Sequence, residues 1–189
     1  MKWIWIKIVQ LFGWKFHLPA KGERPELNRC IFAVAPHTSI YDFMVGAAYL
    51  WALDVNGKIF IKKEFFVWPL GPILRKLGAI SVDRGNRHNG MVETAVKEFA
   101  KGDTFSIAIT PEGTRKPVKR WKRGFYDIAT KANVPIIPAC INFKSKEIYL
   151  KEAFYPSGDF MADLPVIMKY FEDVEARHPE KYNKRMSNE

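Results

Sequence analysis

Short apolar runs alternate along the chain with longer segments in which apolar residues recur at helical spacing. The runs are bounded by polar residues, Gly or Pro, and they predict buried strands at 31–35, 58–63, 79–82, 104–110, 134–143 and 147–150. The longer segments predict helices at 40–53, 91–101, 121–133 and, as an amphipathic and charge-rich tail, from about residue 160. Residues 64–78 are apolar but contain Pro69, Gly71 and Pro72, which predicts a kinked or split helix.

This order of elements predicts an α/β fold, with a mostly parallel central sheet flanked by helices in a single domain. A length of 189 residues suits one such domain. In open parallel sheets, ligand-binding groups gather in the loops beyond the carboxyl ends of the strands. Functional side chains are therefore expected directly after a strand.

The first 17 residues are apolar, rich in Trp and interrupted by Lys. They are predicted to form a separate segment before the main domain, residues 18–189. As a helix they would carry one broad apolar face, with Lys2 and Lys7 opposite it and Trp3 near the boundary. That pattern predicts an amphipathic helix lying in a membrane headgroup layer. An ordinary helix covering the domain's own core is the alternative. No apolar stretch approaches the ~18 residues of a transmembrane helix and no small-residue cleavage site follows, so neither a span nor a signal peptide is expected.

The formal net charge of +10 predicts an anionic partner, and the candidates are nucleic acid, an anionic lipid surface and a phosphorylated substrate. Cys30 and Cys140 each lie beside an apolar run, which predicts buried free thiols in a reducing compartment. With four scattered His residues and no paired Cys, no metal site is expected.

The first candidate site is the stretch Pro36-His37-Thr38-Ser39-Ile40-Tyr41-Asp42, directly after a predicted strand. On a continuous helix, positions five apart point about 140° away from each other. His37 and Asp42 therefore meet only if His37 stays in the loop and Asp42 lies in the first helical turn, with Thr38 or Ser39 as N-cap. The carboxylate would then fix the imidazole tautomer and leave the other ring nitrogen to act as a base. The alternative is a capping box of Ser39 and Asp42 with His37 merely adjacent.

The second candidate site is Thr110-Pro111-Glu112-Gly113-Thr114-Arg115, which again follows a predicted strand. Gly113 permits a tight turn, exposed N–H groups can face an anion, and Arg115 can bind phosphate oxygens in a bidentate manner. Glu112 could hold that guanidinium or accept a hydrogen bond from a substrate hydroxyl. An ordinary turn would have the same composition.

Two further groups are basic. Arg84, in the turn after the run 79–82, is a candidate second phosphate contact or half of a surface Asp–Arg pair. A basic cluster surrounds Trp121 and consists of Arg115, Lys116, Lys119, Arg120, Lys122 and Arg123. Such a cluster could track a nucleic-acid backbone, meet anionic headgroups or form a solvated face.

Together these segments resemble the phospholipid and glycerolipid acyltransferase family, which includes 1-acylglycerol-3-phosphate acyltransferases. Its four sequence blocks occur in order between residues 31 and 143: His-x4-Asp at His37 to Asp42, the stretch KKEFFVWPLGPILRKLGAISVDRG, Pro-Glu-Gly-Thr-Arg at 111–115 with WKRGF after it, and VPIIP at 134–138. The chain is short, and Pro36 stands where Asn is more usual. The resemblance is greatest to a compact bacterial branch of the family.

The resemblance implies an O-acyltransferase of phospholipid biosynthesis. It would move a fatty acyl group from acyl-CoA or acyl-carrier protein to the hydroxyl of a lysophospholipid-type acceptor, 1-acylglycerol-3-phosphate foremost. It implies His37 and Asp42 as the catalytic pair, and as substrate-binding residues Glu112, Gly113, Thr114, Arg115, Arg84 and Lys122. No cofactor is implied beyond the thioester co-substrate. The expected location is an anionic membrane surface at the cytoplasmic face of the cell membrane, as a peripheral or monotopic protein without a nucleic-acid partner.

Transfer without an acyl-enzyme is expected, because the chain has no Gly-x-Ser-x-Gly elbow and neither Cys lies in a loop suited to a nucleophile. Other functions remain open at this stage. The same fold could acylate an amino-acid-based lyso-lipid or bind lipid without catalysis. A basic nucleic-acid-binding module would account for the charge, but it leaves the His, Asp, Glu and Arg residues at strand ends unexplained.

Overall fold

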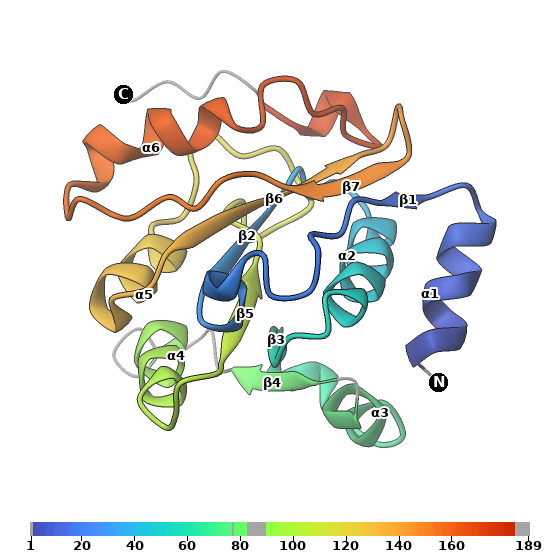
Figure 1. The fold of residues 1–189 in the computed structure, drawn as a ribbon, viewed down its shortest axis with the longest axis horizontal. Helices are drawn as coiled ribbons and strands as arrows, with labels where there is room; N and C mark the ends of the chain where they lie inside the picture. Colours follow the sequence, from blue (N-terminus) through green and yellow to red (C-terminus); the bar gives the residue numbers. More distant parts are fainter. Residues whose placement is uncertain (1, 77, 83–89, 184–189) are drawn as a thin grey trace.

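The computed structural model describes residues 2–76, 78–82 and 90–183, and these form a sheet covered by helices on both faces (Figure 1). The strands are β1 Lys15–Phe16, β2 Ile31–Ala35, β3 Gly57–Lys62, β4 Ala79–Val82, β5 Ser106–Ile109, β6 Ile136–Asn142 and β7 Glu147–Leu150. The helices are α1 Lys2–Leu11, α2 Ile40–Ala52, α3 Leu70–Lys76, α4 Met91–Phe99, α5 Gly124–Ala132 and α6 Phe160–Lys169. Three 3-10 turns are η1 Pro25–Asn28, η2 Lys63–Phe65 and η3 Pro179–Lys181.

The seven strands lie in the order β1-β7-β6-β2-β5-β3-β4, and each neighbouring pair is parallel except β6 and β7. The predicted mostly parallel α/β sheet is thus confirmed. The apolar stretch 64–78 is split, as its Pro and Gly residues predict, into η2 and α3. The strands β2 and β5 are neighbours near the centre of the sheet, and Ala33 of β2 pairs with Ile109 of β5.

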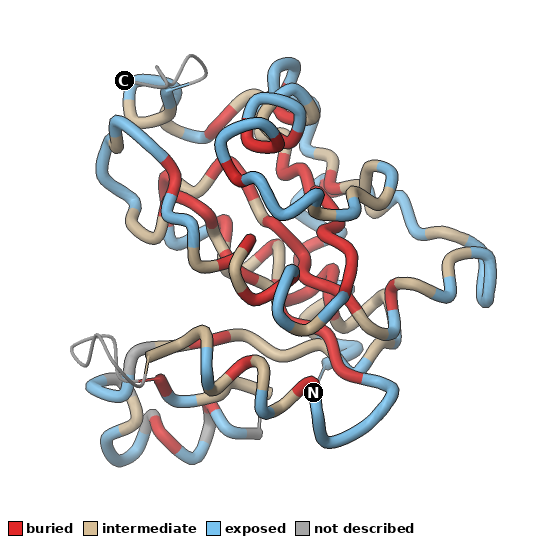
Figure 2. The backbone as a smooth tube through the Cα atoms, turned by 90° about the vertical axis from the view of Figure 1, so that its left-hand side faces the viewer, coloured by how far each residue is buried: buried red, intermediate tan, exposed pale blue. Residues whose placement is uncertain are grey.

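Alternate residues of the central strands point to opposite faces of the sheet. In β2, Ile31, Ala33 and Ala35 join the core beneath α4, α5 and α6, whereas Phe32 packs on the other face with residues of η1 and α2. Figure 2 shows the buried residues, in red, concentrated in the middle of the molecule. Cys30 and Cys140 are buried free thiols, as predicted, and burial raises the pKa of both to about 12.

The N-terminal helix is shorter than residues 1–17. It ends at Leu11, and the chain then turns so that β1 adds to the sheet edge beside β7. Trp5, Ile6 and Val9 pack with the core that lies against α2, while Trp14 is buried in the same core. One side of α1 therefore covers the domain, and the sequence pattern alone did not separate this side from the exposed one.

The C-terminal tail is not one long helix. The helix α6 ends at Lys169, and the segment that follows returns over the sheet, with Phe171, Val174 and Ala176 buried. The N–H of Phe143, just after β6, donates to the carbonyl of Glu175 at 2.8 Å. The expectation of a helix continuing toward the chain end was wrong, because these apolar side chains pack separately and Pro179 begins a short 3-10 turn.

Ile107 of β5 belongs to the main hydrophobic core. We expect Ile107→Ala to lower the free energy of unfolding by about 2–5 kcal/mol, because Ile107 is fully buried in β5 and the change leaves a cavity. Urea unfolding monitored by circular dichroism would measure the loss. Val166→Ala, on the solvent side of α6 at 49% exposure, is the control and should change stability little. Equal losses for the two variants would contradict this account of the core.

Candidate active site

The loops that follow β2 and β5 meet at one edge of the sheet. The two strands are parallel neighbours, so their carboxyl ends lie side by side and bring His37 next to Glu112. The backbone N–H of His37 donates a hydrogen bond of 2.7 Å to Oε1 of Glu112. The two candidate sites predicted from the sequence are therefore parts of one site.

Asp42 lies in the first turn of α2 and Ser39 is its N-cap. Oδ2 of Asp42 accepts the N–H of Thr38 at 2.5 Å and that of Ser39 at 2.7 Å, and Oδ1 accepts the Ser39 hydroxyl at 2.9 Å. The Ser39 side chain in turn caps the helix, which completes a capping box. The side chain of Asp42 is 1% exposed. Its carboxylate is thus held in one orientation.

The imidazole of His37 lies against this carboxylate. Nδ1 of His37 is 3.3 Å from Oδ2 of Asp42, and the His37 side chain is 19% exposed. The contact lacks the alignment of a hydrogen bond. The buried Nδ1 therefore has no hydrogen-bond partner in the described part of the chain. A small rotation of the ring would align Nδ1–H with the carboxylate, as commonly happens when substrate binds. The predicted arrangement, with His37 in the loop and Asp42 in the first helical turn, is confirmed.

Glu112 points into the protein, with 1% exposure, and does not line the pocket described below. Burial raises the pKa of its carboxyl to about 8, the neighbouring charge of Asp42 adds to this rise, and the hydrogen bond from the His37 N–H opposes it. The sequence suggested that Glu112 contacts Arg115 or substrate. In the structure its carboxyl instead holds the loop that carries His37.

The turn after Glu112 depends on Gly113, which has a φ of +65°. A Cβ at this position would lie 2.9 Å from Cδ of Lys122, because the Lys122 side chain lies directly over the turn. The N–H of Lys122 also donates to the carbonyl of Pro111 at 2.9 Å. Lys122 thus supports the turn and places a cation beside it.

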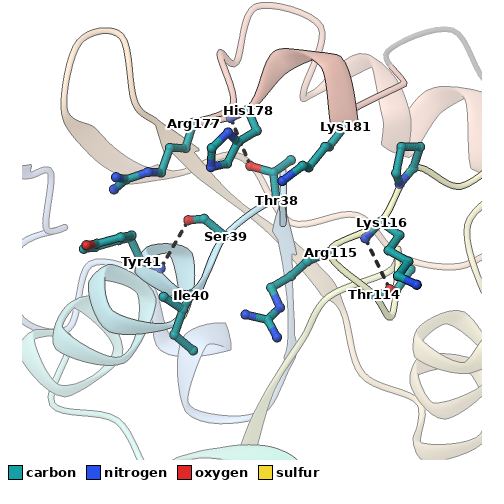
Figure 3. Close-up of a pocket in the computed structure, with 11 residues that line it drawn as sticks. Thr38, Ser39, Ile40, Tyr41, Thr114, Arg115, Lys116, Arg177, His178 and Lys181 are labelled. Carbon is teal, nitrogen blue, oxygen red and sulfur yellow. Dashed lines mark hydrogen bonds between the residues drawn. The ribbon is translucent and has the colours of Figure 1, made fainter.

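A pocket of about 660 Å³ opens next to this pair of loops (Figure 3). It is lined by Thr38, Ser39, Ile40, Tyr41, Thr114, Arg115, Lys116, Pro117, Arg177, His178 and Lys181. His37 itself is not a lining residue, but Thr38 directly after it is. The pocket thus begins at the residue that follows His37 in the chain.

The structure gathers most of the site residues predicted from the sequence. Thr114 and Arg115 line the pocket, whereas Glu112, Gly113 and Lys122 are not lining residues and form or support the turn before Thr114. Arg84 falls outside the described residues. Three basic lining residues of the C-terminal segment were not among the predicted ones: Arg177, His178 and Lys181. The only signal available for them was their charge, since they belong to no motif.

Trp121 does not present its ring to a ligand. It is 3% exposed and packs edge-on against Phe125 and Phe171, with ring centroids 6.1 Å and 5.5 Å away. The basic residues around it thus lack the exposed aromatic platform that base stacking requires. In the part of the chain that the structure describes, no three His, Cys, Asp or Glu side chains cluster to hold a metal ion. No helix there is long and apolar enough to cross a bilayer.

The fold places the chain in a known structural class. The crystal structure of the 1-acyl-sn-glycerophosphate (LPA) acyltransferase PlsC from Thermotoga maritima superposes with a TM-score of 0.60, over 93% of this chain and 79% of that chain. Sequence identity in this superposition is 18%, so the likeness concerns the fold.

Sequence comparison then identifies the family. Residues 18–142, more than half of the chain, match the Acyltransferase family, and the chain belongs to this family. The 1-acyl-sn-glycerol-3-phosphate acyltransferase of Escherichia coli (strain K12) is 28% identical over 151 residues, which cover 76% of this chain and 59% of that protein. The human 1-acyl-sn-glycerol-3-phosphate acyltransferase beta is 27% identical over 78% of this chain and 53% of its own length. The chain thus spans somewhat over half the length of these relatives.

The buried carboxyl of Glu112 makes stability depend on pH. Between its ordinary pKa and about 8, the folded state binds one proton more at Glu112 than the unfolded state does. The free energy of unfolding should therefore fall as pH rises from about 5 to 8, by up to ~1.4 kcal/mol per pH unit. Glu112→Gln, whose amide oxygen can still accept the His37 N–H, should flatten this slope in urea unfolding measured across the range.

The exposed Glu152 supplies the matched control. Glu152→Gln removes the same charge from the surface and should leave the pH slope of the wild-type protein in place. If Glu112→Gln and the wild-type protein lost stability in parallel, the carboxyl of Glu112 would not be the group responsible.

Proposed function

We propose that this protein is an O-acyltransferase of phospholipid biosynthesis. It moves a fatty acyl group from acyl-CoA or acyl-carrier protein to the hydroxyl of a lysophospholipid-type acceptor, with 1-acylglycerol-3-phosphate as the preferred acceptor. The observation that carries the proposal is the 3.3 Å contact of the His37 imidazole with the buried Asp42 carboxylate, beside a basic pocket. The names of the relatives described above support the same acceptor.

The proposed chemistry begins with His37 as general base. Its Nε2 takes the proton of the acceptor hydroxyl while the oxygen attacks the thioester carbonyl, and Asp42 holds Nδ1 and stabilises the imidazolium that forms. When the tetrahedral intermediate collapses, the carbon–sulfur bond breaks and the imidazolium returns the proton to the thiolate. The products are the acyl ester and a free thiol. No metal or organic cofactor takes part in these steps.

The pocket would act by positioning the acceptor. Arg115 and Lys116 lie on the wall formed by the loop after β5, opposite the first turn of α2 (Figure 3). A phosphate bound there places the rest of the acceptor near Thr38, the residue after His37. Such positioning replaces a bimolecular encounter by a reaction between held groups, which is a large part of catalysis.

The proposed location is a membrane surface, at the cytoplasmic face of the cell membrane, and exposed side chains at the N-terminus support the contact with lipid. Although Trp5, Ile6 and Val9 cover the domain, Trp3, Leu11 and Phe12 are 67%, 86% and 70% exposed. Exposed apolar side chains next to lysines suit the headgroup layer of an anionic membrane. The helix would thus have both functions that its sequence suggests: one face would pack on the core and the other would contact lipid.

The first test is a screen of acceptors. The protein is incubated with a labelled acyl-CoA or acyl-carrier protein and a panel of lyso-acceptors, and the mass of each product is read directly. Acylation of 1-acylglycerol-3-phosphate supports the proposal, whereas acylation of an amino-acid-based lyso-lipid alone would assign another acceptor. No product with any acceptor would refute the enzymatic function.

In the same assay His37→Ala should lower the rate by about 10²–10⁴-fold, because general-base catalysis contributes that much. The reading is the initial rate at saturating acceptor. His17→Ala is the control, since His17 has a 56% exposed side chain beside Glu147, near the edge strand β1. Near-normal turnover by His37→Ala would exclude this residue as the base.

The membrane proposal predicts that Leu11→Asp and Phe12→Asp each weaken binding to vesicles of anionic phospholipid by about 10-fold or more. Burying such a side chain contributes roughly 1.5–3 kcal/mol. Flotation of the vesicles measures the bound fraction. Met161→Asp, at a 54% exposed position on α6, adds the same charge away from α1 and should bind as the wild-type protein does. Unchanged flotation of the α1 variants would mean that this helix only covers the core.

A further inference from the structure

The third wall of the pocket comes from the far end of the chain. Figure 3 shows Arg177, His178 and Lys181 facing the loop after β2 from the side opposite Arg115. The family match ends at residue 142, so these three residues lie outside every segment that defines the family. Their presence at the site follows from the way the tail returns over the sheet after α6.

This wall is fixed in place by several contacts. Val174 and Ala176 are buried beneath it, and the N–H of His178 donates to the hydroxyl of Thr38 at 3.3 Å. The guanidinium of Arg177 lies 3.7 Å from the ring centroid of Tyr41, which also lines the pocket. Stacking of this kind restricts a long cationic side chain to one region while leaving its N–H groups available. The tail is thus attached to the loop after β2 at Thr38, and it holds the Arg177 guanidinium over Tyr41 in the first turn of α2.

Among the described residues, the charged ones that line the pocket are all basic. Its basic lining residues are Arg115, Lys116, Arg177, His178 and Lys181, and none of the lining residues that the structure describes is acidic. Three carboxylates near these residues already have partners: Asp42 accepts the N–H groups of Thr38 and Ser39, Glu112 accepts that of His37, and Glu180 lies 3.5 Å from His178. The walls therefore favour a ligand group that carries more than one negative charge.

We propose that Arg177 and Lys181 bind the terminal phosphate of the acceptor together with Arg115, and that this C-terminal wall sets the headgroup preference. The inference rests on the proposed acyl transfer and assigns a role to residues outside the family motifs. A phosphate monoester carries about −1.5 to −2 charges at neutral pH, which matches cations on both walls. A zwitterionic headgroup would bring an ammonium group that finds no carboxylate among the described lining residues.

Phosphate groups occur on acceptor and donor alike, since coenzyme A also carries them, and the experiment has to separate these sources. sn-Glycerol 3-phosphate, which contains only the acceptor's headgroup, is titrated calorimetrically into the protein at low salt. The variants are Arg177→Gln and Lys181→Gln. Lys169→Gln, which removes a charge from an exposed position at the end of α6, is the matched control.

We expect each pocket variant to raise the dissociation constant about 10-fold or more, because each removes a charge-assisted hydrogen bond to phosphate. The control should change it less than about 2-fold. Arg177→Lys, which keeps the charge but loses the planar stack on Tyr41, should fall between wild type and Arg177→Gln. Circular dichroism of each variant confirms that the fold is retained, and Lys181→Gln keeps the test decisive if Arg177→Gln loosens the tail.

Kinetics supply the second reading. The pocket variants should raise KM for the phosphorylated acceptor more than they lower kcat, and should reduce its advantage over a lysophosphatidylcholine acceptor. A raised KM for acyl-CoA with unchanged binding of sn-glycerol 3-phosphate would assign the wall to the donor and overturn the inference. Unchanged binding in both variants, or no binding by the wild-type protein, would also overturn it. A wild-type protein that binds the probe but transfers no acyl group would refute the proposed function alone.

Discussion

The parallel pairing of β2 with β5 is the constraint on which the site depends. It brings together two loops that are about seventy residues apart in the chain, and the hydrogen bond from the His37 N–H to Glu112 joins them across 75 positions. The Glu112 carboxyl that accepts this bond is 1% exposed, and a buried carboxyl that lost its partner would be costly. The position of the imidazole is thus set by the sheet rather than by the loop alone.

Asp42 has two tasks that the sequence presented as alternatives. Its carboxylate satisfies the free N–H groups at the start of α2, and the same oxygen that accepts them lies beside Nδ1 of His37. The electric field of the helix N-terminus and these hydrogen bonds both stabilise a negative charge on the carboxylate. A charged orienter is therefore available to the imidazole without a separate residue to hold it.

Much of the fold followed from local signals. The strands around residues 31–35 and 79–82 and the split at Pro69 were predicted from apolar runs and breakers, because these effects act within a few residues. The inward direction of Glu112 was not predicted, since the same turn composition fits a side chain pointing either way. The burial of Trp121 and the return of the tail to the pocket depend on partners distant in sequence, and no periodicity reports them.

The capping box has a consequence for the length of the first motif. A helix start places the acid that closes the box three positions after the N-cap, and His37 stands two residues before that N-cap. One inserted residue would carry the ring away from the acid while leaving the cap whole, so the interval of four residues behaves as a ruler set by helix geometry. The tail that walls the pocket is under no such rule. Changes there can alter which molecules are accepted while the proposed catalytic pair stays as it is.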